Sequence, residues 1–312
     1  MSRYALGIDT SNYRTSCALF DIDAGTYQNI GELLDVPAGQ LGLRQSDALF
    51  QHVKKLPGLL DRLMTAKQGD IVAVGVSDRP RRQEGSYMPC FLAGVSSARS
   101  IAAALGLEAC FFSHQEGHIA SALYSAGRLN WMDRPFLSWH LSGGTTELLY
   151  VRSSNRGVMD VQVIGGTRDI AAGQLIDRAG VALGLPFPSG PHLEKLARSS
   201  DSGDFSRVRL DGLFFSFSGV ENQFRAALEH GKAPEDVARF VLNTVVQTVR
   251  RDTEAAKALY DLPVLFSGGV SASIYLQDAM PPCDDLCYAQ QGLGGDNALG
   301  AAVLSAIRGG IR

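Results

Sequence analysis

The chain has 312 residues, of which 45% are hydrophobic and 20% are charged, so it can bury large cores and is not intrinsically disordered. Its 29 basic and 32 acidic residues give a net charge of −3, which argues against a strongly basic nucleic-acid binder but leaves room for a local basic patch. Five scattered cysteines favour a reduced, cytoplasmic protein, and no apolar run reaches the roughly 18 residues of a membrane span, so we expect no membrane partner.

The N-terminal stretch predicts a β-hairpin whose turn carries an acid and hydroxyl groups. Residues 4–9 and 15–21 are largely apolar runs typical of strands, and Asp9 and Ser11 lie where the first run ends. Such a turn can face the phosphates of a nucleotide, with the acid positioning a metal ion or a water. An ordinary hairpin without a ligand is the alternative interpretation.

The next elements lead into a loop rich in arginine. Apolar residues recur at helical spacing over 47–66, residues 71–76 predict a buried strand, and small residues over 91–105 predict a tightly packed helix. The polar loop 78–87 follows the buried strand, and it is either a solvated loop or a clamp for phosphate or RNA. Its basic residues are Arg79, Arg81 and Arg82.

Two of the six histidines lie four residues apart at the start of a predicted helix. Ser113 is a good N-cap residue and Glu116 completes a capping box, while the apolar run 109–112 before them predicts a buried strand. Helical spacing places His114 and His118 on one face, where two neutral imidazoles can hold one divalent metal. A chance pair that faces solvent is the alternative.

A second hairpin repeats the pattern of the first. Strands are predicted at 136–140 and 148–151, and the turn between them, 141–147, contains two adjacent glycines and several hydroxyl groups. Glycines leave space for backbone N–H groups to approach an anion. Two such turns, about 130 residues apart, predict a duplicated fold whose halves grip one nucleotide.

The second half of the chain adds several helices and two further glycine motifs. Helices are predicted over 171–183, which carries Asp177, and over 221–230 and 234–259. A strand is predicted over 214–219. The polar segment 199–212 is predicted to be a surface excursion. The strand 262–266 ends in Gly268-Gly269, whose backbone amides lie where a helix starts. Asp296 lies between glycines before a C-terminal helix, either as an N-cap or as a third, anionic metal ligand.

Taken together, these residues resemble the TsaD/Gcp family of the ASKHA superfamily over nearly the whole chain. The resemblance implies an α/β, two-lobed, actin- or hexokinase-like fold with duplicated mixed β-sheets flanked by helices. It divides the chain into an N-terminal lobe, 1–126, a C-terminal lobe, 127–295, and a last helix, 296–312, that packs back on the first lobe. The motifs that carry it are His114-Gln115-Glu116-Gly117-His118, Leu141-Ser142-Gly143-Gly144, Gly184-Leu185-Pro186, Phe215-Ser216-Phe217-Ser218-Gly219, Gly268-Gly269-Val270 and Asp296-Asn297.

The resemblance also implies the ligands and the residues that bind them. His114, His118 and Asp296 match the ligands of one divalent metal, iron or zinc. The bound nucleotide is ATP or a carbamoyl-adenylate, and the matching positions are Leu141, Ser142, Gly143, Gly144, Thr145, Asp177, Gly190 and Glu194. The turns described above add Asp9, Ser11, Gly268, Gly269 and Ser273 to the predicted nucleotide site. No dedicated catalytic nucleophile is evident, which fits direct transfer.

The activity implied by the resemblance is that of a carbamoyltransferase. Such an enzyme moves a threonylcarbamoyl, or related carbamoyl, group from a carbamoyl-adenylate to an amine acceptor, which in this family is the adenosine at position 37 of tRNA. The implied partners are tRNA, an adenine nucleotide and either TsaB-like and TsaE-like subunits or a second copy of the chain.

The chain departs from the family pattern at several polar positions. Residues 12–15 lack two acids of the family's first turn, Thr145 replaces a histidine, and Ser273 replaces an asparagine. Ile170 and Gln174 replace two carboxylates, and the loop 79–87 replaces a Gly-Pro-Gly loop. These differences indicate a divergent bacterial paralogue. They leave two alternatives: a non-catalytic nucleotide-binding protein that regulates or scaffolds another protein, and a carbamoyltransferase that acts on a small molecule.

Overall fold

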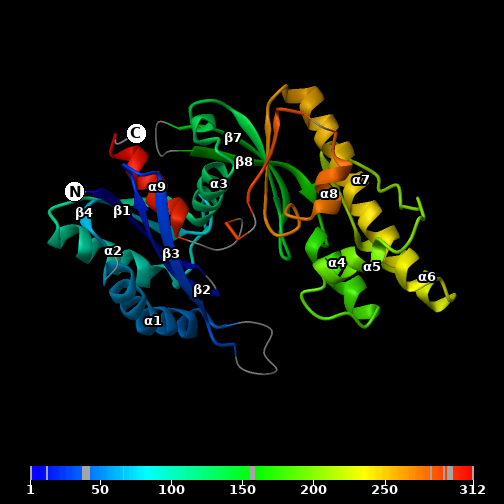
Figure 1. Ribbon diagram of the computed structural model, residues 1–312, viewed down its shortest axis with the longest axis horizontal. Coiled ribbons are helices and arrows are strands. Elements are labelled where there is room, and N and C mark those ends of the chain that lie inside the picture. The colour runs from blue at the N-terminus through cyan, green and yellow to red at the C-terminus, as the bar shows by residue number, and fades with distance from the viewer. Residues whose placement is uncertain are drawn as a thin grey trace. The chain divides into compact units, whose positions relative to one another are not determined.

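A computed structural model of the chain describes residues 2–11, 13–36, 43–65, 67–154, 159–281, 283–290, 292–293 and 298–310. The chain divides into two compact units, each built around its own sheet (Figure 1). Unit 1 consists of Met1–Met132, Ser153–Asp160 and Gly295–Arg312, and unit 2 consists of Asp133–Arg152 and Val161–Gly294. Both sheets mix parallel and antiparallel strands, so the predicted α/β class with two mixed sheets is confirmed.

The sheet of unit 1 has, among the described residues, five strands in the order β3-β2-β1-β4-β5. β1 pairs antiparallel with β2 and parallel with β4, and β4 pairs parallel with β5, so the predicted hairpin is present. Because β1, β4 and β5 run in the same direction, their carboxyl ends meet at one edge of the sheet. The strands are β1 Ser2–Ser11, β2 Arg14–Asp21, β3 Thr26–Leu33, β4 Gly69–Arg79 and β5 Ala109–Ser113.

Helices cover both faces of this sheet. α1 (Gln45–Thr65) and α2 (Phe91–Ala104) pack on the face that carries Leu6 and Ile8, and they share one apolar core with it. α1 buries Ala48, His52, Leu56, Leu59 and Leu63, a helical spacing that explains why this segment forms an amphipathic helix. The opposite face contacts α9 (Leu299–Arg308), which also packs on α3 (His114–Ser125).

Glycines allow α9 to lie directly on the sheet and on α3. A Cβ atom added to Gly7 of β1 would clash with the carbonyl oxygen of Ala298, and one on Gly75 of β4 would clash with that of Ala301. Gly300 faces the Gly117 backbone in the same way, at the middle of the histidine segment of α3. The backbone of α9 therefore supports the helix that carries His114 and His118.

The sheet of unit 2 has the order β11-β10-β6-β7-β8-β9 within the described part of the chain. β6 and β7 form the second predicted hairpin, antiparallel from Phe136 to Val151, and β10 pairs parallel with both β6 and β11. A short 3-10 helix, Leu129–Asp133, precedes β6. The strands are β6 Phe136–Leu141, β7 Thr146–Ser153, β8 Met159–Thr167, β9 Phe214–Phe215, β10 Val264–Ser267 and β11 Leu286–Tyr288.

The helices of unit 2 pack around one large apolar core that includes Trp139 and Phe224. The longest, α7, begins with Pro234 in its first turn, which also carries two acids, and its C-cap, Asp261, has a left-handed backbone with φ 49°. All three features are common at helix ends. The helices are α4 Ala172–Ala182, α5 Gly190–Ala197, α6 Ser218–Glu229, α7 Pro234–Tyr260 and α8 Ile274–Ala279.

One predicted strand is wrong in its extent. The segment 214–219 is a strand only at Phe214–Phe215, and α6 already begins at Ser218. The reason is Asp169, whose carboxylate accepts hydrogen bonds from the backbone N–H groups of Phe217 (2.7 Å) and Ser218 (3.1 Å). Backbone N–H groups at the start of a helix have no partner within the helix, so these bonds stabilise the start of α6. Burial would raise the pKa of Asp169, but these bonds outweigh it and lower the pKa to about 2.

No helix in the described ranges is both long and apolar enough to span a membrane.

Candidate metal and nucleotide sites

The helix that carries the two histidines starts as its sequence predicts. The Ser113 hydroxyl accepts a hydrogen bond from the backbone N–H of Glu116 (3.2 Å), and the Glu116 carboxylate accepts one from the backbone N–H of Ser113 (2.7 Å). This reciprocal capping box fixes the first turn of α3 directly after β5. His114, the first residue of the helix, therefore lies at the carboxyl end of a parallel strand.

The imidazoles of His114 and His118 face each other through their Nε2 atoms. These two nitrogens lie 2.8 Å apart, and the rings meet edge to face with centroids 4.3 Å apart. Two imidazole Nε2 atoms this close together can serve as two histidine ligands of a single divalent metal. The helical spacing of the two residues thus brings both donor atoms together.

Asp9 orients the first of these histidines. Its Oδ2 lies 2.8 Å from His114 Nδ1, and its Oδ1 accepts a hydrogen bond from the backbone N–H of Ser11 (3.0 Å). The Asp9 side chain is 2% exposed, so this contact is shielded from water. A carboxylate on Nδ1 favours the Nδ1–H tautomer, in which Nε2 carries the lone pair that can bind a metal. The sequence predicts Asp9 as part of the nucleotide site, where it positions a metal ion or a water, and in the structure its carboxylate contacts His114.

The third predicted ligand, Asp296, lies outside the described residues. Within the residues that are described, no group of three or more His, Cys, Asp and Glu side chains that could hold a metal is found. His114 and His118 therefore supply two donors, and Asp296 stays a prediction as the third.

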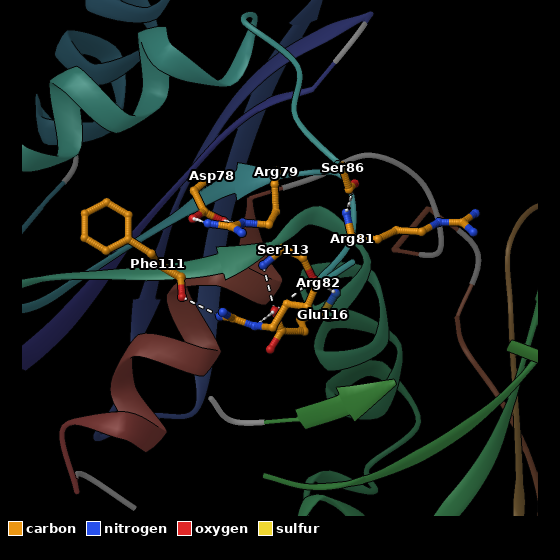
Figure 2. A network of polar contacts seen from close by, with 8 residues as sticks. All are labelled: Asp78, Arg79, Arg81, Arg82, Ser86, Phe111, Ser113 and Glu116. Carbon is orange, nitrogen blue, oxygen red and sulfur yellow. Dashed lines mark hydrogen bonds and ion pairs between the residues drawn. The ribbon is translucent and has the colours of Figure 1, made fainter. Parts of the chain in front are cut away.

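The arginine loop after β4 is joined to the histidine helix by the ion pair between Arg82 and Glu116 (Figure 2). The Arg82 guanidinium donates to the Glu116 carboxylate and to the Phe111 carbonyl oxygen, both at 2.8 Å. Arg79 donates to the carboxylate of Asp78, its neighbour in sequence, at 3.0 and 2.8 Å. Because these two guanidinium groups already hold carboxylates, the contacts favour a structural role for the loop over a phosphate clamp.

Unit 2 contains a cavity of about 790 Å³ that is large enough for a nucleoside. Apolar side chains form much of its wall, including Ile176, Leu242, Val245, Val246 and Ile274. Such a wall suits the faces of a planar base. Residues that the sequence predicts to bind nucleotide also line this cavity; they are Gly143, Asp177, Gly190, Glu194, Gly269 and Ser273.

Glu194 organises the polar side of this cavity. Its carboxylate accepts hydrogen bonds from the Ser273 hydroxyl (2.8 Å), the Arg198 guanidinium (2.8 Å) and the backbone N–H of Tyr275 (3.3 Å). Ser273 also caps α8 by accepting from the backbone N–H of Leu276. The serine that departs from the family pattern therefore joins α5 to the start of α8.

Among the residues that the structure describes, one hydrogen bond holds the side chain of Asp177. Its Oδ1 accepts a hydrogen bond from the backbone N–H of Ser189 (2.8 Å), which joins α4 to the start of α5. Two carboxylates, from Asp177 and Glu194, thus line one cavity. Carboxylate oxygens are natural acceptors for the hydroxyl groups of a ribose.

The β6–β7 turn leaves its two glycines open. The Ser142 hydroxyl accepts from the backbone N–H of Thr145 (3.0 Å), which closes the turn, and the positions of a Cβ on Gly143 and Gly144 meet no atom within 4 Å. Leu141 is fully buried, so it can offer a ligand only its backbone. Gly268 has φ 92° and lies against the Leu141 carbonyl, where a side chain would be strained and would clash.

Comparison with known proteins identifies the family of the chain. Residues 27–302 match the model of the TsaD family, described as tRNA N6-adenosine threonylcarbamoyltransferase. The chain belongs to the TsaD family. A relative of that name from Halalkalibacterium halodurans is 32% identical over 289 residues, which cover 88% of this chain and 80% of the relative. One from Bacillus licheniformis is 29% identical over 331 residues, which cover 99% and 93%.

Solved structures confirm the ASKHA fold of this TsaD family member. HypF in a phosphate- and nucleotide-bound form is similar with a TM-score of 0.60 and 13% identity, over 96% of this chain and 55% of that one. A ROK hexokinase from Thermus thermophilus is similar with a TM-score of 0.54 and 14% identity, over 98% and 99%. At these identities the likeness concerns the fold alone. The predicted family and the predicted fold are both confirmed.

Proposed function

We propose that the chain is a threonylcarbamoyltransferase that moves its acyl group from a carbamoyl-adenylate to the adenosine at position 37 of tRNA. In this reaction the adenine amine forms a bond to the carbamoyl carbon, the bond from that carbon to the adenylate phosphate oxygen breaks, and one amine proton is released. AMP is the leaving group. The observation that carries the proposal is the convergence of the His114 and His118 Nε2 atoms, oriented by Asp9, in a chain of the TsaD family.

The donor set in unit 1 fits a divalent metal. The two imidazole Nε2 atoms are 2.8 Å apart, and a buried carboxylate holds His114 Nδ1, so Nε2 would be the nitrogen of His114 that coordinates the metal. His114 and His118 would hold the ion together with Asp296, and iron or zinc suits imidazole ligands. When bound, the ion would polarise a carbonyl group as a Lewis acid. Asp9 keeps the His114 ring in place for this task.

Unit 2 supplies the nucleoside site in this proposal. The apolar wall of the cavity, with Ile176 and Val245, excludes water from a bound base, while Asp177 and Glu194 would accept hydrogen bonds from ribose hydroxyls. The open glycines of the β6–β7 turn would let backbone N–H groups approach the phosphate of the adenylate. Binding and orientation by these groups would provide much of the rate enhancement.

The experiment is a transfer assay with purified components. The chain, loaded with iron or zinc, is mixed with threonylcarbamoyl-adenylate, a tRNA with adenosine at position 37, and TsaB-like and TsaE-like partner subunits. Mass analysis of the digested tRNA should show the threonylcarbamoyl adduct on adenosine. Nucleotide binding without any adduct would refute the enzyme in favour of a regulatory or scaffolding protein. Carbamoylation of a small amine with unmodified tRNA would refute tRNA as the acceptor.

A further inference from the structure

Unit 2 has a second cavity, of about 570 Å³, that is lined by three arginines and one carboxylate. We call it the basic hollow, defined by Arg168, Arg207, Arg209, Asp211 and Gln223. Its charged lining carries 3 − 1 = +2, although the whole chain carries −3. These residues lie outside the nucleotide cavity and come from the position directly after β8, from the irregular stretch before β9, and from α6.

Arg168 neutralises the only carboxylate among the residues that define the basic hollow. Its guanidinium donates to Asp211 Oδ2 at 2.6 Å and lies 5.1 Å from the centre of the Phe214 ring. Its backbone N–H donates to the Phe215 carbonyl oxygen at 2.8 Å, so the residue is fixed at both ends. The hydrogen bond from Arg168 holds the pKa of Asp211 below its ordinary value, and the nearby charge of Arg209 adds to the effect. Asp211 is therefore ionised but already paired.

Arg207 and Arg209 are the groups left to bind a ligand. Val208 between them is buried, whereas the side chains of Arg207 and Arg209 are both exposed. Within the described part of the chain, neither guanidinium takes part in a hydrogen bond or an ion pair.

The stretch that carries the two arginines is held in place by α7. The Arg251 guanidinium donates to the Val208 carbonyl oxygen at 2.9 Å, and the Thr244 hydroxyl accepts from the backbone N–H of Ser206 at 2.9 Å. The backbone is thus fixed on the core while the charged ends of Arg207 and Arg209 face solvent. A fixed backbone reduces the conformational entropy lost when these arginines bind a ligand.

We propose that the basic hollow binds the phosphodiester backbone of the RNA acceptor, an inference that rests on the proposed function. Exposed guanidinium groups bind a single small phosphate weakly, but on a polyelectrolyte each contact releases condensed counterions and adds to affinity. Arginine also pairs with phosphate through two parallel hydrogen bonds. Asp169 links the hollow to the nucleotide cavity, because it follows Arg168 directly and lies shortly before α4, the helix that carries Asp177.

The test compares two charge-matched double variants in binding to labelled tRNA across a range of salt concentrations. Arg207→Ala/Arg209→Ala should lose roughly tenfold or more in affinity at low salt, and the slope of log affinity against log salt should fall by about 2. The control, Lys54→Ala/Arg99→Ala, removes two exposed positive charges from α1 and α2 of unit 1 and should keep the wild-type slope. Equal slopes for the two double variants would overturn the proposal.

Asp211→Asn provides a variant expected to gain affinity. It removes the negative charge of the hollow and frees Arg168, so tRNA binding should tighten severalfold, a change that unfolding cannot mimic. Unchanged or weaker binding by a folded Asp211→Asn variant would contradict the proposal. Inorganic phosphate is the second probe. If millimolar phosphate displaces tRNA from the wild type but not from the double variant at equal ionic strength, the hollow is a small-anion site and the assignment to the RNA backbone is wrong.

Failure of this inference can be told apart from failure of the proposed function. If the wild type modifies tRNA and the Arg207→Ala/Arg209→Ala variant has the same KM for tRNA, the inference is overturned and the proposed function stands. A wild type that binds adenine nucleotide but neither binds nor modifies tRNA overturns both. The inference is supported when the double variant has a raised KM for tRNA but wild-type affinity for the adenylate.

Discussion

The two candidate sites differ in how their polar groups are arranged. In unit 1, side chains hold one another: Asp9 holds His114, and His114 faces His118. In unit 2, the wall of the cavity is largely apolar, and its carboxylates, Asp177 and Glu194, accept hydrogen bonds from backbone N–H groups and from the side chains of Ser273 and Arg198. Side chains that hold one another suit a metal ion, because its ligands need a fixed geometry. A broad apolar cavity suits a nucleotide base, which binds through the complementary shape of the cavity wall. Changes in one site should therefore leave the other ligand bound.

The largest expected effect is loss of metal from His114→Ala/His118→Ala. The wild type, loaded with iron or zinc and dialysed, should retain about one ion per chain, and the double variant less than about a tenth of that, because only one predicted ligand would remain. Metal content is measured by elemental analysis. His192→Ala/His230→Ala, which removes two exposed histidines of unit 2, should keep the metal. If the His114→Ala/His118→Ala variant stays folded and keeps its metal, the metal site is refuted.

Replacing the orienting carboxylate should weaken the metal without removing it. Asp9→Asn keeps the size of the side chain but removes the charge that supports His114, so metal affinity should fall about 10- to 100-fold. Competition with a metal-binding dye measures the change. Asp23→Asn is the matched control, since Asp23 pairs with Arg3 on the exposed side of the same hairpin region. Identical affinities for the two variants would mean that Asp9 has only a structural role.

A change in unit 2 should affect the nucleoside and not the metal. Glu194→Gln weakens the carboxylate contacts to Ser273 and Arg198 and removes a charged acceptor, so affinity for an adenylate analogue should fall about tenfold. Titration calorimetry gives the affinity, and elemental analysis should show unchanged metal. Glu229→Gln, an exposed glutamate at the end of α6, serves as the control. Loss of metal from the Glu194→Gln variant would show that the two sites do not bind their ligands independently.

The smallest effect expected concerns stability and lies outside both sites. Asp252 of α7 is fully buried, and neither carboxylate oxygen has a hydrogen-bond partner among the described residues. Burial raises its pKa from the ordinary 3.8 to about 7. Since the folded pKa is the higher one, the folded state binds the proton more tightly, and stability is lost as pH rises from about 4 through about 7.

Asp252→Asn should therefore raise Tm by a few degrees at pH 8 and change it little at pH 4. Scanning calorimetry at the two pH values measures this difference. The exposed Asp201→Asn variant should show no such dependence on pH. A destabilised Asp252→Asn variant at pH 8 would mean that the carboxylate has a partner that stabilises its charge.

Much of the fold could be predicted because its signals are local. Alternating and helical apolar patterns gave both hairpins and α1, and the pair Ser113 and Glu116 gave the start of α3, since a capping box spans only four residues. The spacing of the histidines likewise brought both Nε2 atoms together within one helix. The combination of these motifs identified the family.

The contacts that were missed join distant parts of the chain. Asp9 and His114 are 105 residues apart, and their meeting depends on β1, β4 and β5 lying parallel. Arg82 and Glu116 are 34 residues apart, and each also fits a local role, in a polar loop or a capping box. The early start of α6 depends on Asp169, 48 residues before Phe217. The stretch 199–212 was predicted only as a surface excursion, because the contacts of Arg251 and Thr244 that fix it come from α7.

The most direct measurement is anomalous diffraction from crystals of the chain loaded with iron or zinc, recorded at the absorption edge of the metal. We expect one strong peak within coordination distance of the Nε2 atoms of His114 and His118, with Asp296 as the further protein ligand. The same experiment on the double histidine variant should show no peak there. A peak elsewhere in the chain, or well-ordered histidines without a peak in loaded crystals, would contradict the account.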